Sequence, residues 1–318
     1  MRVVFFGTPA VAAGALEHLL GSSHQVAAVV TQPDRPRGRS GRPEPPPVKE
    51  LAAARGLPAL QPSSPRDPGF PAELGSLAPD VCAVVAYGHI LPTEVLAVPP
   101  RGFVNVHFSL LPRYRGAAPV QRALMAGETE TGVTTFLLEP TMDTGPILMQ
   151  ETVAIGDDDA GALLARLGEV GARLLVATLD AMERGRISPV PQDPGLASPA
   201  PKIKPEDAAI DWSRPAAEIV NLVRAMNPAP GAHTTFRGKR LKVSAAGRID
   251  HPVPPGAAPG EVIPAGREGL VVAAGKDAVR LLRVQLEGGV PLDGASFLRG
   301  HRPEAGERLG VDRPHGRD

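Results

Sequence analysis

One stretch of the sequence places an amide and an imidazole where they could act together. Asn105 and His107 stand two residues apart at the end of an apolar run that is typical of a β-strand, so their side chains project from the same face. Side by side, an amide and an imidazole can donate hydrogen bonds to an oxyanion as it forms, and the imidazole can also move a proton. These two residues are the first candidates for an active site.

A carboxylate follows in a turn. Asp143 lies in the sequence Met-Asp-Thr-Gly-Pro, after a second predicted strand over 132–138. If that strand ran parallel to the first, Asp143 would come beside His107 and could fix the orientation of its ring. These residue types also have plainer uses, because Asn and Asp are common in turns and a histidine at a strand end is often structural. Residue types alone therefore leave both interpretations open.

The scaffold that must position these residues is predicted by hydrophobic periodicity. Continuous apolar runs, typical of strands buried on both faces of a parallel sheet, occur at 3–6, 26–30 and 81–85. Helical spacing predicts a helix over 11–20, with Thr8 as its N-cap and Pro9 at its first helical position, and a long amphipathic helix over 163–182. We therefore expect an α/β fold: an open, mainly parallel Rossmann-like sheet with helices on both faces and ligands at the strands' carboxyl ends.

The amino-acid composition of the sequence changes after this domain. We expect the first domain to span 1–188, a stiff Pro-rich linker 189–205 and a second domain 206–318. A helix is predicted over 211–226, and the rest alternates short β-type runs with Gly-rich turns, a pattern typical of a small OB-like β-barrel.

Composition and charge exclude several classes of protein. The 34 basic and 34 acidic residues give a net charge of zero, which argues against a protein that coats nucleic acid through bulk positive charge. Cys82 is the only cysteine, so an intrachain disulfide and a multi-cysteine zinc site are excluded. The apolar runs are too short to span a membrane, and we find no secretory signal. We therefore expect a cytoplasmic protein.

Several nucleotide-binding and hydrolase motifs are missing. There is no G-x-G-x-x-G, no G-x-x-x-x-G-K-[ST], no H-E-x-x-H and no G-x-S-x-G. Gly7-Thr8-Pro9 stands where a dinucleotide fingerprint would, but it lacks the glycines that let a backbone approach a pyrophosphate.

The run that holds the first two candidates resembles a known family. Residues 105–121, Asn-Val-His-Phe-Ser-Leu-Leu-Pro-Arg-Tyr-Arg-Gly-Ala-Ala-Pro-Val-Gln, are similar to the methionyl-tRNA formyltransferases. The resemblance spans nearly the whole chain, with further matches at Thr31–Pro36, Met142–Gly145, Ile210–Trp212 and Arg224–Pro228. The motif Asn-x-His-x-Ser-Leu-Leu-Pro is shared by formyltransferases that use 10-formyltetrahydrofolate, while Arg-Gly-Ala-Ala-Pro and the second domain narrow the resemblance to the tRNA-directed branch.

The resemblance implies a role for each matching residue. It assigns catalysis to Asn105, His107 and Asp143, with 10-formyltetrahydrofolate as formyl donor, no metal, and the methionine amine of initiator methionyl-tRNA as acceptor. The residues expected against the folate are Ser109, Leu110, Leu111, Pro112, Ala86, Tyr87, Gly88 and Ile90. Those expected against the tRNA are Arg35, Arg37, Arg39, Arg42, Lys239 and Arg240. Phe108 stands where the family commonly has glycine, and we expect it to point away from His107 into neighbouring structure.

Other interpretations remain for the basic segments and for the acceptor. The arginine loop, residues 34–43, could be an ordinary solvated loop. The second basic segment, residues 236–242, could simply form a hairpin turn at Gly238, with charges that keep the strand edges soluble. A formyltransferase acting on a small amine, such as a purine nucleotide precursor or an amino sugar, could share the three catalytic residues without needing either basic segment. A nucleic-acid-binding protein with an inactive α/β domain is a third possibility, although an intact triad counts against it. We expect the chain to act as a monomer.

Overall fold

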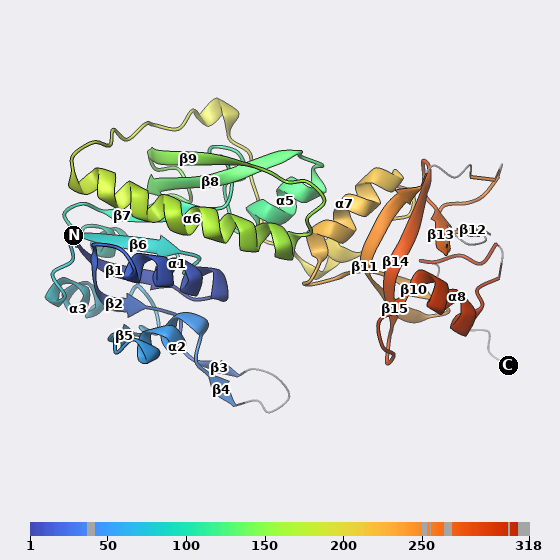
Figure 1. Ribbon diagram of the computed structural model, residues 1–318, viewed down its shortest axis with the longest axis horizontal. Coiled ribbons are helices and arrows are strands. Elements are labelled where there is room, and N and C mark those ends of the chain that lie inside the picture. The colour runs from blue at the N-terminus through green and yellow to red at the C-terminus, as the bar shows by residue number, and fades with distance from the viewer. Residues whose placement is uncertain (37–41, 250–252, 255, 264–268, 305, 311–318) are drawn as a thin grey trace. The chain divides into compact units, whose positions relative to one another are not determined.

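The computed structural model describes residues 1–36, 42–249, 253–254, 256–263, 269–304 and 306–310 (Figure 1). The chain forms two compact units, the first comprising 1–119, 130–154 and 164–201 and the second 120–129, 155–163 and 202–318. Among the helices of these residues, none is both long enough and apolar enough to cross a membrane.

The first unit is built on a seven-stranded sheet with the order β5-β2-β1-β6-β7-β8-β9 (Figure 1). The strands are β1 (Arg2–Gly7), β2 (Gln25–Val30), β5 (Ala59–Leu60), β6 (Val81–Val85), β7 (Phe103–His107), β8 (Glu130–Leu137) and β9 (Ile147–Ala154). The strands from β5 to β7 pair in parallel. The carboxyl ends of β1, β6 and β7 therefore meet at one edge of the sheet, the usual place for a ligand. A separate ribbon pairs β3 (Arg35–Pro36) with β4 (Pro43–Glu44).

The last two strands correct the predicted parallel arrangement around the carboxylate. β8 pairs antiparallel with β7, where His107 lies opposite Thr134, and β9 pairs antiparallel with β8. A parallel pair needs a crossover that carries the chain back to the starting edge. Between β7 and β8, a stretch that is described throughout, the single helix is the short α5 (Pro119–Met125). The chain therefore turns back directly, and Asp143 lies in the connection between β8 and β9.

Helices cover both faces of this sheet. They are α1 (Ala10–Leu20), α2 (Pro47–Ala54), α3 (Phe70–Ser76), α4 (Thr93–Leu96) and the long α6 (Ala160–Glu183). On one face, α6 approaches the sheet so closely that a Cβ on Gly171 would lie 2.8 Å from Cγ1 of Val106. A Cβ on Gly168 would lie 2.7 Å from Cγ2 of Val11 of α1. On the other face, residues of α3 and α4 join a buried cluster that includes Phe103 of β7.

The second unit contains an antiparallel sheet with the order β10-β11-β14-β13-β12, and β15 pairs with β14. Its elements are α7 (Ala216–Met226), β10 (Ala232–Phe236), β11 (Lys239–Ile249), β12 (Val262–Ile263), β13 (Leu270–Ala273), β14 (Ala278–Leu286), β15 (Leu292–Asp293) and α8 (Gly294–His301). Two 3₁₀ turns, η1 (Pro194–Leu196) and η2 (Pro205–Ala208), precede α7. A mainly parallel sheet with helices followed by an antiparallel half-barrel confirms the predicted fold class.

Two helices begin later than their sequences predicted. Pro9, rather than Thr8, occupies the N-cap of α1, and the Thr8 hydroxyl instead donates to the Tyr87 carbonyl at 3.2 Å. The predicted helix from residue 211 starts only after Pro215, because residues 211–214 first form a turn. In this turn the backbone carbonyl of Asp211 accepts from the Arg214 N–H at 3.2 Å.

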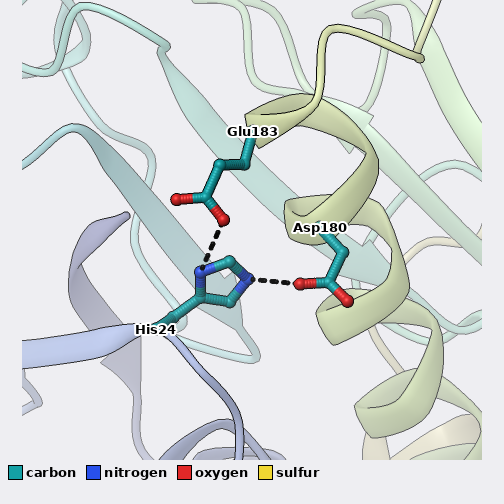
Figure 2. Close-up of side chains that lie close together, drawn as sticks. All are labelled: His24, Asp180 and Glu183. Atoms are coloured by element: carbon teal, nitrogen blue, oxygen red, sulfur yellow. Dashed lines mark ion pairs between the residues drawn. The ribbon is translucent and has the colours of Figure 1, made fainter.

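His24, Asp180 and Glu183 form a small polar cluster at the end of α6 (Figure 2). The Met1 amine is bonded to this cluster. The Met1 amine donates to Oε1 of Glu183 at 2.8 Å and lies 3.2 Å from Nδ1 of His24, whose Nε2 lies 3.2 Å from Oδ1 of Asp180. The His24 side chain is fully buried. Its burial, followed by the positive charge of the Met1 amine, lowers the pKa of the imidazole below 6.5.

We expect this histidine to make the protein less stable in mild acid. An imidazole whose folded-state pKa is lowered contributes stability that is fully present above its unfolded-state pKa, roughly 6.5, and is lost as the pH falls through the lowered folded-state value. Urea unfolding of the wild type and of His24→Asn at about pH 8 and about pH 5 measures this loss. The wild type should lose more of its free energy of unfolding than the variant, and equal losses would contradict the assignment.

Candidate active site

The alternation of side chains along β7 sets the face on which the candidate site lies. Val106 and Phe108 point to α6, where a Cβ on Gly171 would lie 3.4 Å from Cε1 of Phe108. Asn105, half-buried, and His107, only 6% exposed, lie on the opposite face because side chains of a strand alternate. Phe108 therefore packs into neighbouring structure as expected.

His107 is held from both sides. Its Nε2 donates to the Tyr114 carbonyl at 2.9 Å, since a carbonyl can only accept, and the edge of its ring faces Phe136. Its Nδ1 lies 3.7 Å from Oδ2 of Asp143, so the imidazole and the carboxylate are brought together as the sequence predicted. That separation exceeds a hydrogen bond, and such contacts are often long before substrate binds.

The Asp143 carboxylate has a firm anchor of its own. Its Oδ2 accepts the Gly116 N–H at 2.8 Å. Gly116 has φ +127°, and a Cβ at this position would lie 2.6 Å from the Ala200 carbonyl oxygen. Only glycine fits there, which explains the Gly of the Arg-Gly-Ala-Ala-Pro motif: it brings a backbone donor to the carboxylate.

The predicted pterin-binding segment follows β6, directly beside β7. Val85, the last residue of β6, pairs with Val106. Ala86 and Gly88 are exposed and have positive φ, and Ile90 is 54% exposed, so their backbone groups and the Ile90 side chain face solvent. The Tyr87 side chain, in contrast, is buried.

Tyr87 belongs to the core by its side chain and to the site only by its backbone. Its ring is 2% exposed and packs edge-on against Phe6, with 5.3 Å between the centroids. Burial raises the pKa of its phenol to about 12. Its carbonyl accepts from Nε2 of Gln32 at 2.9 Å and from the Thr8 hydroxyl. Sequence reasoning missed Gln32 and Thr8 as supports of this turn, because a side chain that bonds to a distant carbonyl leaves no periodic signal.

Residues 109–112, which lie just after β7, form a tight loop. Ser109 is fully buried, and its hydroxyl donates to the Arg113 carbonyl at 2.6 Å, so it holds the loop closed. The residues around it line a cavity of about 520 Å³: Leu110, Leu111, Pro112, Arg113, Tyr114, Leu196 and Ser198. Three of the eight residues expected against the folate, Leu110, Leu111 and Pro112, therefore border a cavity next to the loop that holds His107.

The arginine segment forms the ribbon of β3 and β4. Arg35 lies on β3 and Arg42 just before β4, and both are exposed. Arg37 and Arg39 lie outside the described residues.

The base of this ribbon is fixed by an ion pair. Asp34 accepts from Nζ of Lys49 at 2.8 Å and from Nε2 of Gln61 at 2.8 Å. The hydrogen bond from Lys49, followed by that from Gln61, lowers the pKa of the Asp34 carboxyl. The negative charge of Asp34, at the start of this basic segment, is thus balanced by Lys49.

The second basic cluster lies at a hairpin. Arg237 and Gly238 both have positive φ and form the two-residue turn between β10 and β11, so the hairpin interpretation of Gly238 is correct. Lys239 and Arg240 follow on β11, both exposed, and Arg240 lies 3.1 Å from Nδ1 of His233.

Within the described part of the chain, one group of three side chains could supply metal ligands close together, namely His24, Asp180 and Glu183 (Figure 2). The Met1 amine already donates to Glu183 and contacts His24, so a positive charge lies within this cluster. None of the three residues belongs to the candidate active site.

The fold and the site together define a class of protein. The His107 imidazole at the end of β7, two residues after Asn105, lies beside the Asp143 carboxylate, on a sheet whose parallel strands end at the same edge. Residues 1–179 match the family described as formyl transferase, and residues 202–302 match the formyl transferase C-terminal domain. The chain is a formyltransferase.

Individual relatives narrow this class. The chain is 49% identical to methionyl-tRNA formyltransferase of Streptomyces coelicolor over 98% of its own length and 100% of that protein. It is 48% identical to methionyl-tRNA formyltransferase of Moorella thermoacetica, over 98% of its own length and 99% of that protein. The chain belongs to the methionyl-tRNA formyltransferase family.

A solved structure shares the fold. HypX from Aquifex aeolicus in complex with tetrahydrofolic acid superposes with a TM-score of 0.65 at 19% identity, over 98% of this chain and 51% of that one. The chain thus spans about half the length of that protein, and at this identity the likeness concerns the fold alone.

Proposed function

We propose that this protein transfers the formyl group of 10-formyltetrahydrofolate to the α-amine of methionine on initiator methionyl-tRNA, for use in translation initiation. The observation that supports the proposal most is the contact between His107 and Asp143 at the end of β7, on the strand that also carries Asn105, in a chain of this family. We propose further that the enzyme works in the cytoplasm as a monomer and uses no metal.

The chemistry assigned to these residues is a direct acyl transfer. The amine nitrogen attacks the formyl carbon, and the carbonyl oxygen becomes an oxyanion that Asn105 stabilises by a hydrogen bond. His107 adds a second hydrogen bond when its Nε2–H turns from the Tyr114 carbonyl to the oxyanion. The bond from the formyl carbon to the folate nitrogen then breaks, and a proton of the amine passes to that nitrogen with the help of His107 and Asp143. The products are formylmethionyl-tRNA and tetrahydrofolate. No covalent enzyme intermediate is needed, in keeping with the absence of a nucleophile motif from the sequence.

The folate is proposed to bind between the two segments that follow β6 and β7. The exposed backbone of Ala86 and Gly88 offers hydrogen-bond partners for the pterin, and Ile90 offers apolar surface. The loop of Leu110 and Pro112 would border the folate from the other side. Ser109 and the Tyr87 side chain would contribute by supporting these segments, since both are buried.

The tRNA is proposed to contact the arginine ribbon and the β10–β11 hairpin. Exposed arginines beside a Gly-rich sequence can contact phosphates and stack on unpaired bases. Arg35, Arg42, Lys239 and Arg240 are exposed, as such contacts require. For Arg37 and Arg39 the proposal rests on the sequence resemblance.

The stoichiometry of the reaction tests the proposal. Purified protein is incubated with 10-formyltetrahydrofolate and charged initiator tRNA, and both products are quantified over time. One tetrahydrofolate should form for each formyl group attached to the methionine. Release of tetrahydrofolate without formylated tRNA would contradict a transfer to this acceptor.

Arg39→Ala tests the arginine loop. We expect kcat/KM for the tRNA to fall while folate binding and folding stay unchanged, because the loop is proposed to contact only the tRNA. Arg66→Ala is the matched control, an exposed arginine of the same unit outside the loop. An Arg39 variant with the same kcat/KM as wild type would remove the loop from the mechanism.

A further inference from the structure

The Pro-rich segment after α6 is bonded to the candidate active site along its length. We call residues 190–200 the strap. In Figure 1 the chain that leaves α6 passes along β9, and Val190 exchanges two backbone hydrogen bonds of 2.8 Å with Ile147. Further on, the Arg115 N–H donates to the Ser198 carbonyl, and the Ala200 N–H donates to the Arg115 carbonyl. The segment predicted as a spacer is thus paired with both loops that carry the site.

Gln192 is the strap residue that grips the Asp143 loop. Its Nε2 donates to the Asp143 carbonyl at 2.9 Å and to the Gly145 carbonyl at 2.7 Å. Its Oε1 accepts from Nε and from one terminal nitrogen of Arg115, at 3.0 and 2.7 Å. All four of these contacts are made by one amide, which therefore ties the carboxylate loop to the loop that supplies the Gly116 donor.

Ser198 acts on the other side of His107. Its hydroxyl accepts the Tyr114 N–H at 2.9 Å. The Tyr114 carbonyl in turn accepts from Nε2 of His107. The strap thus supports both partners of the imidazole, Tyr114 at one nitrogen and Asp143 at the other.

The backbone at these two partners is one that needs support. Asp143 has φ +54° and Tyr114 has φ +60°, both in the left-handed region. This conformation is strained for residues other than glycine and persists where the surroundings fix it. The strap supplies a bond at each residue: Gln192 to the carbonyl of Asp143, and Ser198 to the N–H of Tyr114.

We infer that Gln192 is a positioning residue, which holds the Asp143 carboxylate beside His107 during the formyl transfer. The inference rests on the proposed function for the reaction it serves. Gln192 touches no reacting group; it acts through the backbone of Asp143 and Gly145.

Gln192→Glu separates the two halves of this contact. The glutamate keeps an oxygen for Arg115 but turns an oxygen, instead of an NH₂ group, toward the two carbonyls. We expect the single-turnover rate of transfer to fall roughly 10- to 100-fold, because a small misplacement of a reacting group costs up to about that factor. The KM values for folate and tRNA should stay unchanged, since the Gln192 amide is bonded to Arg115 and to two backbone carbonyls and is not proposed to bind either substrate.

Asp193→Ala is the matched control on the same segment. Asp193 caps the turn η1 by accepting the Gly195 N–H, a bond within the turn and not to the Asp143 loop, so its loss should leave the rate unchanged. Hydrogen exchange of residues 138–146 provides a second readout that needs no substrate. Exchange should be faster in Gln192→Glu than in wild type and unchanged in Asp193→Ala, with equal thermal midpoints showing that all three proteins fold.

Each outcome decides a different point. Faster exchange with a lower rate and unchanged KM supports the inference. Faster exchange with an unchanged rate, or a changed KM alone, overturns the positioning role, and unchanged exchange overturns the contact itself. If the wild type transfers no formyl group to methionyl-tRNA, the proposed function fails, while the exchange measurement still decides whether Gln192 holds the loop.

Discussion

Asn105→Ala is expected to lower kcat for formyl transfer by roughly 10²–10³, the usual cost of removing one donor from an oxyanion site. The Asn105 amide lies on the same face of β7 as His107, and it would meet the formyl oxygen only as negative charge develops there. A donor that acts mainly in the transition state affects kcat more than substrate affinity. KM for the tRNA should therefore change little.

A second asparagine provides the control for this truncation. Asn221 lies half-buried on α7 and belongs to the second unit, whereas the candidate site belongs to the first, so Asn221→Ala removes the same atoms from a residue that is not part of the site. The control should turn over like wild type. Near-wild-type turnover by Asn105→Ala would show that its amide does not stabilise the oxyanion.

Asp143→Asn is expected to have an effect at least as large, roughly 10²–10⁴ in kcat, the range assigned to a positioned acid or base. Asparagine keeps an oxygen that can accept the Gly116 N–H, so the loop should stay in place. What is lost is the negative charge 3.7 Å from Nδ1 of His107 and the ability to accept a proton. The substitution therefore tests the chemistry of the carboxylate rather than its shape.

Asp193→Asn makes the same chemical change on an exposed turn of the same unit and should leave kcat unchanged. Retention of full activity by Asp143→Asn would mean that this carboxylate neither orients His107 nor moves the proton. A loss of activity accompanied by a lower thermal midpoint would instead indicate that the charge is needed for folding.

Much of the scaffold follows from local patterns. Strands buried on both faces leave continuous apolar runs, so β1, β2 and β6 could be found from the sequence, as could the amphipathic α6. The direction of β8 could not, because it depends on whether the connection from β7 crosses the sheet, which no single segment records. The start of α7 was predicted too early because residues 211–214, which form a turn, have the composition of a helix. The helix itself begins only after Pro215.

The candidate site, too, could be predicted only in part. The i, i+2 spacing placed Asn105 and His107 on one face, and the turn after the next predicted strand suggested Asp143, to which the family resemblance assigned a catalytic role. The residues that hold them could not be predicted: Gln32 and Gln192 donate to backbone carbonyls far away in sequence. Such bonds depend on loops meeting in space, and a Pro-rich segment like the strap shows only the composition of a linker.

The net charge of zero is an average over unlike parts. Residues 1–201 carry 16 basic and 20 acidic side chains, a net charge of −4, whereas residues 202–318 carry 18 and 14, a net charge of +4. Such a distribution excludes indiscriminate binding of nucleic acid but leaves room for one tRNA held by a basic second domain and a local group of arginines.

The central claim is that methionyl-tRNA is the formyl acceptor, and a competition between acceptors tests it most directly. The protein is given labelled 10-formyltetrahydrofolate with initiator methionyl-tRNA and an excess of small primary amines, including an amino sugar nucleotide and a purine precursor amine. The label should appear on the methionine of the tRNA, and Asn105→Ala should abolish most of this transfer. Label on a small amine, with none on the tRNA, would contradict it.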